Sequence, residues 1–186
     1  MNRINIPNLL SGLRILLIPV LIIVFYTAPL DWRYLASAIV FFVAAITDWL
    51  DGYLARSMGQ MTPFGAFLDP VADKLLVATS LVLLVEVHAS AILAVPAIVI
   101  VGREIVVSAL REWMAELGKR GVVAVSIWGK VKTAAQMLSI IALLSRYNEV
   151  VIQIGYGLLY IATALTISSM ISYLWAAGQA IKEDNK

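Results

Sequence analysis

The sequence predicts an all-α integral membrane protein, a bundle of six transmembrane helices that forms one domain over residues 1–186. Of these residues 61% are hydrophobic and only 14% are charged, whereas soluble domains have about 45–50% apolar and about 25% charged residues. The apolar residues also gather in six segments. The length of each is close to the roughly 20 residues that a helix needs to cross a bilayer. A formal charge of +2 does not favour nucleic-acid binding, and the lack of cysteine excludes disulfides and thiolate metal sites.

Short polar links separate the six predicted spans. The spans cover approximately residues 8–28, 34–54, 65–86, 89–111, 126–145 and 150–178. The first is predicted to be a retained helix, because no small-residue cleavage pattern follows it. Residues 1–10 mix apolar and polar side chains, which predicts a short N-terminal interfacial helix ahead of the first span.

The distribution of lysine and arginine predicts the orientation. If both termini are cytoplasmic, Arg33 and Arg146 are the only basic residues in the outer loops. Basic residues accumulate on the cytoplasmic side of membrane proteins, so we expect both termini there.

Several spans contain charges at their inner ends. The second is uncharged only between Tyr34 and Thr47, which is too short for an upright crossing, so the helix must continue through Asp48 and Asp51. By the same argument the third span includes Asp69 and Asp73. Charges at this depth are costly and rarely face lipid, which predicts a polar cavity open to the cytoplasm.

The spacing of these four aspartates predicts a cluster. Residues three or four apart share a helix face, so Asp48 points with Asp51, and Asp69 with Asp73. The short link makes the two helices antiparallel neighbours. Four carboxylates cannot remain ionised together without compensation, and Mg²⁺ or Mn²⁺ suits carboxylate oxygens. Two such ions about 3.5–4 Å apart form a clamp for phosphoryl displacement.

Other interpretations of the cluster remain open. Membrane carboxylates also serve ion or proton transport, and a purely structural cluster would destabilise the bundle.

Gly52 and Gly65 allow close approach of a helix or ligand. Arg56 lies one turn beyond Gly52, where a guanidinium can bind a phosphate through two hydrogen bonds.

Basic residues in the later spans are candidates for the same cavity. Arg103 and Arg111 are eight residues apart and lie on broadly one helix face. Lys130 and Lys132 point in nearly opposite directions, so at most one of them faces the cavity directly. Lys132 is the stronger candidate, but the sequence does not decide between the two, and a lysine at a helix end often serves only as an interfacial anchor. Glu104 is expected to pair with a basic residue that the sequence does not identify.

The aspartate motif closely resembles that of the CDP-alcohol phosphotransferase family. That pattern has two aspartates, Gly, Ala-Arg, and then Gly with two more aspartates. Here it reads Asp48-Trp-Leu-Asp51-Gly52-Tyr-Leu-Ala55-Arg56, eight residues, and Gly65-Ala-Phe-Leu-Asp69-Pro-Val-Ala-Asp73. The resemblance covers nearly the whole chain and is weakest in the last span.

The resemblance implies a function and a set of roles. Members transfer a phosphatidyl group from CDP-diacylglycerol to a small alcohol and release CMP without a covalent enzyme intermediate. The resemblance assigns metal ligation to Asp48, Asp51, Asp69 and Asp73, which would hold two Mg²⁺ or Mn²⁺ ions. Asp73 also accepts the proton of the attacking hydroxyl. The CDP-binding residues are Gly52, Ala55, Arg56, Gly65 and Asn8, with Arg14 at the same depth. A homodimer surrounded by membrane lipid is also implied.

The acceptor follows from a closer resemblance within the family. The segments around Asn5–Leu10, Arg103-Glu104, 109–120 and 129–133 resemble bacterial members that use glycerol 3-phosphate. This implies location in the bacterial cytoplasmic membrane. A dianionic phosphate needs a basic pocket, which Arg103, Arg111 and Lys132 can provide. Inositol phosphate, serine and phosphatidylglycerol are alternative acceptors, and a cation transporter is the alternative outside the family.

Overall fold

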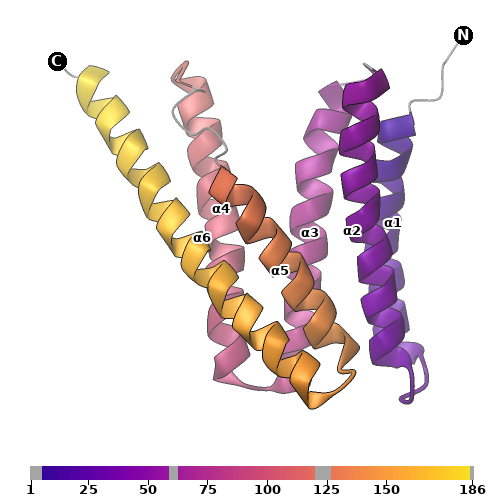
Figure 1. Cartoon of the computed structure of the whole chain (residues 1–186). Helices are drawn as coiled ribbons and strands as arrows, with labels where there is room; N and C mark the ends of the chain where they lie inside the picture. Colours follow the sequence, from indigo (N-terminus) through magenta and orange to yellow (C-terminus); the bar gives the residue numbers. More distant parts are fainter. Residues whose placement is uncertain (1–5, 59–62, 120–126, 185–186) are drawn as a thin grey trace, which may run out of the picture.

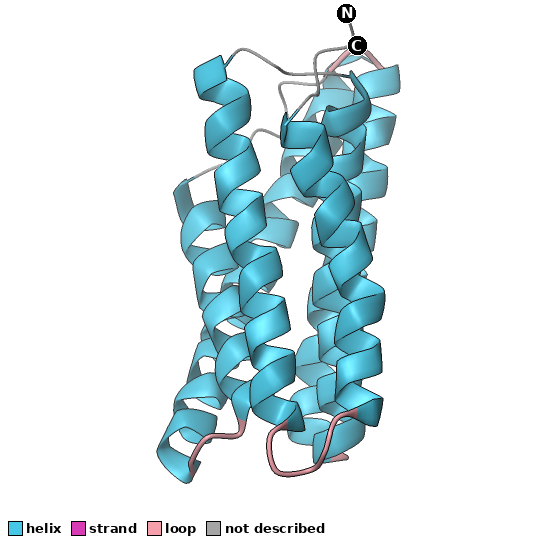
Figure 2. Ribbon diagram, turned by 90° about the vertical axis from the view of Figure 1, so that its right-hand side faces the viewer, coloured by secondary structure: helices cyan, strands magenta, loops and turns pink. Residues whose placement is uncertain are grey.

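The computed structural model describes residues 6–58, 63–119 and 127–184, and this part of the chain contains six α-helices and no strand (Figures 1 and 2). The all-α prediction is therefore confirmed. The helices are α1 (Ile6–Thr27), α2 (Arg33–Met58), α3 (Pro63–His88), α4 (Ala91–Glu116), α5 (Ile127–Ser145) and α6 (Glu149–Asp184).

Several of the helices extend beyond the ends of the apolar segments from which they were predicted. We expected a polar link from residue 112, yet α4 continues to Glu116, and α2 continues to Met58. The apolar stretch ends at the first charged residues. The helix continues because its backbone hydrogen bonds do not depend on apolar side chains. The predicted interfacial helix falls partly on residues 1–5, which lie outside the described part, and residues 6–10 already belong to α1.

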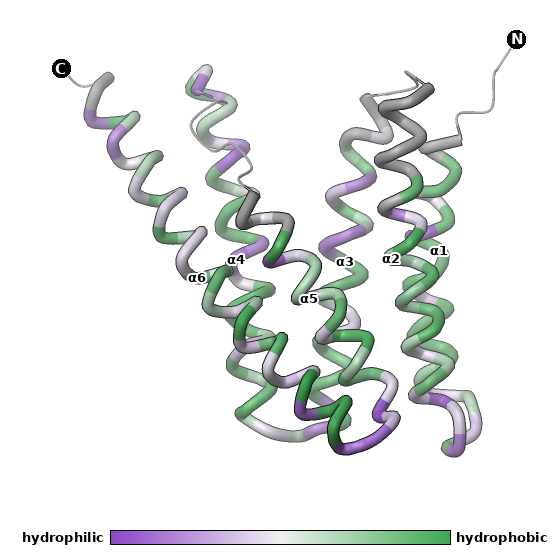
Figure 3. Tube along the Cα trace, in the orientation of Figure 1, coloured by the Kyte–Doolittle hydropathy of each residue, from purple (hydrophilic) through white to green (hydrophobic). Residues whose placement is uncertain are grey.

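The composition of the helices agrees with a membrane bundle. By length and hydropathy, α1, α4 and α6 each contain a segment suited to crossing a bilayer, and α5 contains the shorter apolar stretch Val131–Ser145. Helices α2 and α3 have 26 residues each but include the predicted aspartates. Hydrophobic residues dominate the middle of the helices, while hydrophilic stretches of α3 and α4 lie in the half of the bundle that contains the start of α1 (Figure 3).

The packing order of the helices leaves an opening on one side. Helix α1 packs against α2 and α3, α5 packs against α6, α2 and α3, and α4 packs against α3 and α6. Within the described residues, α4 and α5 are not packed against each other. Their facing sides can therefore line a polar pocket.

The hydrophobic core fills the half of the bundle that holds the three turns between α1 and α2, α3 and α4, and α5 and α6. Its fully buried side chains include Phe41, Leu84, Leu93 and Leu143. Buried arginine and lysine lie toward the other half, at Arg14, Arg103 and Lys132. The main core thus fixes the helices at one end. At the opposite end, near the charged groups, a smaller cluster of Leu110, Met114 and Ala177 joins α4 to α6.

Helices α5 and α6 approach each other closely at Gly155. A Cβ placed there would lie 2.8 Å from Leu143 Cγ and 3.2 Å from Ala142 Cβ. The backbone also meets the partner helix, since Ser139 Oγ donates a hydrogen bond of 2.8 Å to the Gly155 carbonyl. We expect Gly155→Ala to lower the thermal unfolding midpoint, because overpacking costs about 1–3 kcal/mol. Gly157→Ala is the matched control: a Cβ there meets nothing within 4 Å. Equal midpoints for the two variants would contradict this account of the contact.

Candidate active site

The predicted aspartates of α2 and α3 meet at two residues of α1. Arg14 Nη1 lies 2.9 Å from Asp48 Oδ1 and also donates to Asp73 Oδ1. One turn earlier, Ser11 Oγ donates to Asp69 Oδ1. Three of the four predicted carboxylates are therefore gathered around one face of α1. The spacing of the motif predicted that the aspartates of α2 and α3 come together, but not that they meet at α1.

Burial differs sharply within this group. The Arg14 side chain is 0% exposed, whereas Asp48 and Asp73 are each 36% exposed. Arg14 tolerates full burial because two carboxylates balance its charge, and an unpaired buried guanidinium would be strongly destabilising. The exposed carboxylate oxygens of Asp48 and Asp73 remain accessible to a ligand.

Part of the predicted site lies outside the described side chains. This applies to Asp51, Gly52, Ala55 and Arg56, all within α2, and to Asn8 in α1. The backbone places the α2 residues in the turns that follow Asp48. Gly65 is described and is buried near the start of α3.

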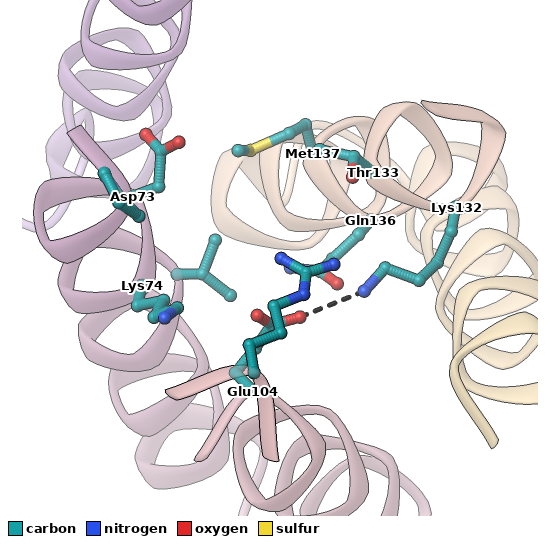
Figure 4. A pocket seen from close by; sticks show the side chains of 10 residues that line it. Asp73, Lys74, Glu104, Lys132, Thr133, Gln136 and Met137 are labelled. Atoms are coloured by element: carbon teal, nitrogen blue, oxygen red, sulfur yellow. Dashed lines mark hydrogen bonds and ion pairs between the residues drawn. The ribbon is translucent and has the colours of Figure 1, made fainter. Parts of the chain in front are cut away.

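A charged pocket of about 200 Å³ opens beside Asp73, between α3, α4 and α5 (Figure 4). It is lined by Pro70, Asp73, Lys74, Val77, Glu104, Arg111, Lys132, Thr133, Gln136 and Met137. Asp73 thus belongs both to the aspartate group and to the wall of this pocket. The pocket brings Arg111 and Lys132 together, as predicted, while the Lys130 side chain lies outside the described residues.

Glu104 links the two sides of the charged pocket. Its Oε1 accepts hydrogen bonds from Lys132 Nζ at 3.0 Å and from Arg103 Nη1 at 2.8 Å. Figure 4 shows the Glu104–Lys132 ion pair crossing from α4 to α5. The basic partners of Glu104, which the sequence did not identify, are therefore Arg103 and Lys132. The carboxylate also offsets part of the like charge on Arg103, Arg111 and Lys132.

Arg103 faces α6 and does not line the charged pocket. Its guanidinium carbon lies 5.7 Å from the centre of the Tyr173 ring, and Nη2 is 3.5 Å from Ser169 Oγ. The guanidinium carbon of Arg111 lies 5.7 Å from the same ring. The two arginines therefore do share a helix face, and Arg103 reaches the pocket only through Glu104.

Gln136 is a pocket residue that the sequence did not suggest. It is only 4% exposed, and its Oε1 is buried without a hydrogen-bond partner. Such atoms are rare in proteins, because each one costs the desolvation of a polar group. Its position one turn after Lys132 is the only signal that the sequence offers.

The aspartates have donor chemistry suited to divalent cations. Carboxylate oxygens are the preferred ligands of Mg²⁺ and Mn²⁺, and a single cationic group already bridges Asp48 and Asp73. Within the residues whose side chains are described, no three acidic or histidine side chains form a metal-sized group. Asp51, whose side chain is not among them, is the remaining member of the motif.

An apolar groove of about 630 Å³ runs between α2 and α5 and has Asp48 at one end. Its walls include Phe42, Ile46, Leu138 and Ile141. A groove of this composition, joined to a carboxylate cluster, fits a ligand with a charged head and an apolar tail.

Comparison with known proteins agrees with these features. The sequence model of the CDP-alcohol phosphatidyltransferase family matches residues 4–170. Proteins named CDP-diacylglycerol–glycerol-3-phosphate 3-phosphatidyltransferase are similar over nearly their full length. The relative from Pseudomonas fluorescens is 56% identical over 98% of this chain and 94% of its own. Those from Haemophilus influenzae and Escherichia coli K12 are 53% and 54% identical, over 94% and 93% of this chain and 94% of their own. The chain therefore belongs to the CDP-alcohol phosphatidyltransferase family.

Proposed function

We propose that this chain transfers the phosphatidyl group of CDP-diacylglycerol to glycerol 3-phosphate, giving phosphatidylglycerophosphate and CMP. One observation carries the proposal: Asp48 and Asp73 of the family motif converge on Arg14, beside a pocket lined by Arg111 and Lys132. A pyrophosphate and a phosphate monoester are both anionic, and this arrangement offers each of them a place. The relatives named above act on these two substrates according to their names.

The aspartate group is the proposed metal and nucleotide site. Asp48, Asp51, Asp69 and Asp73 would hold two Mg²⁺ or Mn²⁺ ions. When bound, these ions neutralise the pyrophosphate of CDP-diacylglycerol. Gly52, Ala55, Arg56, Gly65 and Asn8 would form the surface that receives the CDP group. Arg14 holds Asp48 and Asp73 in place from the buried side.

The charged pocket is the proposed acceptor site. Arg111 and Lys132 bind the phosphate of glycerol 3-phosphate through charged hydrogen bonds, and Arg103 supports them through Glu104. The unpartnered Gln136 Oε1 can accept a hydrogen bond from a hydroxyl of the acceptor. Serine offers no phosphate to Arg111 and Lys132, so the pocket favours a phosphorylated acceptor.

Asp73 stands where the two proposed sites meet. The acceptor hydroxyl oxygen attacks the phosphorus that carries diacylglycerol, and the bond from that phosphorus to the CMP oxygen breaks. Asp73 takes the proton of the hydroxyl, and CMP leaves as the anion. A carboxylate is a weak base, but the hydroxyl gains acidity as its oxygen bonds to phosphorus, so the position of Asp73 is decisive. The apolar groove between α2 and α5 would hold an acyl chain.

Release of CMP tests this function directly. Purified protein should release CMP from CDP-diacylglycerol when glycerol 3-phosphate is added, and should release far less with serine, which has no phosphate for the charged pocket. Preferred use of inositol phosphate would overturn the choice of acceptor but not the transfer reaction. Excess chelator should abolish the release, and Mg²⁺ or Mn²⁺ should restore it. Full activity in chelator would disprove the metal role. Absence of CMP with every acceptor would favour a transporter instead.

We also propose that the aspartate end of the bundle faces the cytoplasm, and that the protein is a homodimer in the bacterial cytoplasmic membrane. The distribution of lysine and arginine supports this orientation, and the start of α1 and the end of α6 lie at the same end of the bundle (Figure 1). The chain has no cysteine, so a Ser57→Cys variant should react with a thiol reagent confined to the cytoplasmic side. A Ser90→Cys variant should react with reagent added outside. Reversed labelling would overturn the orientation.

A further inference from the structure

Two arginines converge on one tyrosine at the end of the bundle opposite the aspartates. Arg33 begins α2, and Arg146 follows the end of α5. Their guanidinium carbons lie 4.9 Å and 4.8 Å from the centre of the Tyr34 ring. Arg33 Nη2 donates a hydrogen bond of 3.1 Å to the Tyr34 hydroxyl, and its guanidinium also lies 6.0 Å from the Phe25 ring. We call these four residues the aromatic–arginine cluster.

The positive charges of this cluster are not balanced by a carboxylate within the part of the chain that the structure describes. Neither arginine forms an ion pair in the described part of the chain. The acidic residues nearest in the sequence, Asp31 and Glu149, are exposed. Glu86 of α3, which lies beside the Phe25–Tyr26 ring pair, accepts a hydrogen bond from the Tyr26 hydroxyl. The Arg33 Nε–H group is buried and makes no hydrogen bond. Two like charges beside one ring, together with a buried donor that has no partner in the described residues, form a surface that an anion would complement.

The backbone holds Arg146 at this position in an uncommon conformation. Its φ of +45° lies in the left-handed region, which residues other than glycine rarely adopt. The residue just after a helix often adopts this region, as Ala89 also does between α3 and α4, and it lets the chain turn there. The turn between α5 and α6 thus carries the Arg146 guanidinium to Tyr34, on a different hairpin of the bundle.

Adjacent aromatic residues fix the depth of the cluster in the membrane. Trp32 precedes Arg33, Tyr147 follows Arg146, and their side chains are 54% and 75% exposed. Exposed tryptophan and tyrosine at helix ends lie at the level of lipid headgroups. Asp48 is fifteen residues along α2 from Arg33, so the cluster is about 20 Å from the proposed active site.

We propose that the aromatic–arginine cluster binds the phosphodiester of a phospholipid headgroup, in the leaflet opposite the aspartates. The phosphate oxygens would accept hydrogen bonds from both guanidinium groups, including the unpartnered Nε–H of Arg33, while the acyl chains lie against the bundle. A lipid is favoured over free phosphate because exposed aromatic residues flank both arginines at headgroup depth. The proposal is independent of the acceptor and of the transfer reaction.

The test titrates the full-length protein in detergent with dioleoylphosphatidylglycerol, whose phosphodiester is its only charged group. Binding is followed by native mass spectrometry and by the thermal unfolding midpoint. Each of Arg33→Gln and Arg146→Gln should weaken binding about tenfold or more, since each removes charged hydrogen bonds. Lys182→Gln removes an exposed charge at the aspartate end and should leave this binding unchanged. Any lipid that binds near the aspartates should bind all variants and the unchanged protein equally. It therefore does not affect the difference in binding between them.

Two further ligands separate the possible sources of the effect. Dioleoylglycerol, which has no phosphate, should bind all variants alike; if the glutamine variants weaken it equally, the arginines act through packing alone and the proposal fails. Inorganic phosphate should not reproduce the stabilisation; if it does, the site is for a free anion. Unchanged phosphatidylglycerol binding in both glutamine variants would also refute the proposal. Should Arg33→Gln not fold, the exposed Arg146 decides, because Arg146→Lys should retain binding that Arg146→Gln loses.

Discussion

Asp48→Asn and Asp69→Asn are each expected to lose phosphatidyl transfer by about 100-fold or more. Asparagine keeps the size of the side chain and an oxygen that can accept from Arg14 or Ser11, so the helix contacts can survive. What disappears is the negative charge that the proposed cations require. Mutating even the outer partners of a metal ligand costs about 10–100-fold in affinity or activity, so loss of a ligand's charge should cost more. Release of CMP from CDP-diacylglycerol measures the effect.

A matched control separates this loss from general damage. Asp31 is exposed at the other end of the bundle, so Asp31→Asn should keep normal activity. All three variants should insert in the membrane and show the same monodisperse peak in detergent. Substantial turnover by Asp48→Asn or Asp69→Asn would argue against that residue as a metal ligand.

Arg111→Ala is expected to raise the Michaelis constant for glycerol 3-phosphate by roughly tenfold to a hundredfold. A charged hydrogen bond contributes about 1.5–3 kcal/mol, which corresponds to that range. Lys132→Ala should have a similar effect, because its ammonium group lines the charged pocket. The Michaelis constant for CDP-diacylglycerol should change little. Arg103→Ala should have a smaller effect, since Arg103 reaches the pocket through Glu104.

The Glu104–Lys132 ion pair allows a sharper form of this test. If Glu104 acts by holding Lys132, then Glu104→Gln should add little to Lys132→Ala, because the effects of coupled residues are not additive. Glu112→Gln, on the same helix but exposed, is the control and should be neutral. Normal use of glycerol 3-phosphate by the alanine variants of Arg103, Arg111 and Lys132 would show that the acceptor phosphate binds elsewhere.

The aspartate group could be predicted from the sequence because the prediction needs only residue spacing within each helix and the length of the link between them. Within one helix, spacing of three or four residues places side chains on one face, and a short link makes the two helices neighbours. These rules bring Asp48, Asp69 and Asp73 together without knowledge of any other helix. The same reasoning correctly placed Arg103 and Arg111 on one face of α4.

The contacts between distant helices could not be predicted in this way. Whether the arginine face of α4 turns toward the pocket or toward α6 depends on how Tyr173 and Ser169 pack against it. The roles of Ser11 and Gln136 depend equally on neighbours far along the chain. Arg14 was expected at the right depth, but its pairing with Asp48 and Asp73 required the three-dimensional arrangement.

The burial of Arg14 has a consequence for biogenesis. The first helix enters the membrane with a charge whose partner Asp73 lies 59 residues later in the chain. An unpaired arginine at the centre of an inserting helix opposes insertion by about 2.5–3.5 kcal/mol, and Arg14, nearer the inner end of its span, opposes it by less. The apolar residues of α1 outweigh this penalty, but the helix becomes fully stable only when α2 and α3 arrive beside it. Assembly of the first three helices is therefore coupled, and a chain truncated before α3 would leave Arg14 facing lipid or the translocation machinery.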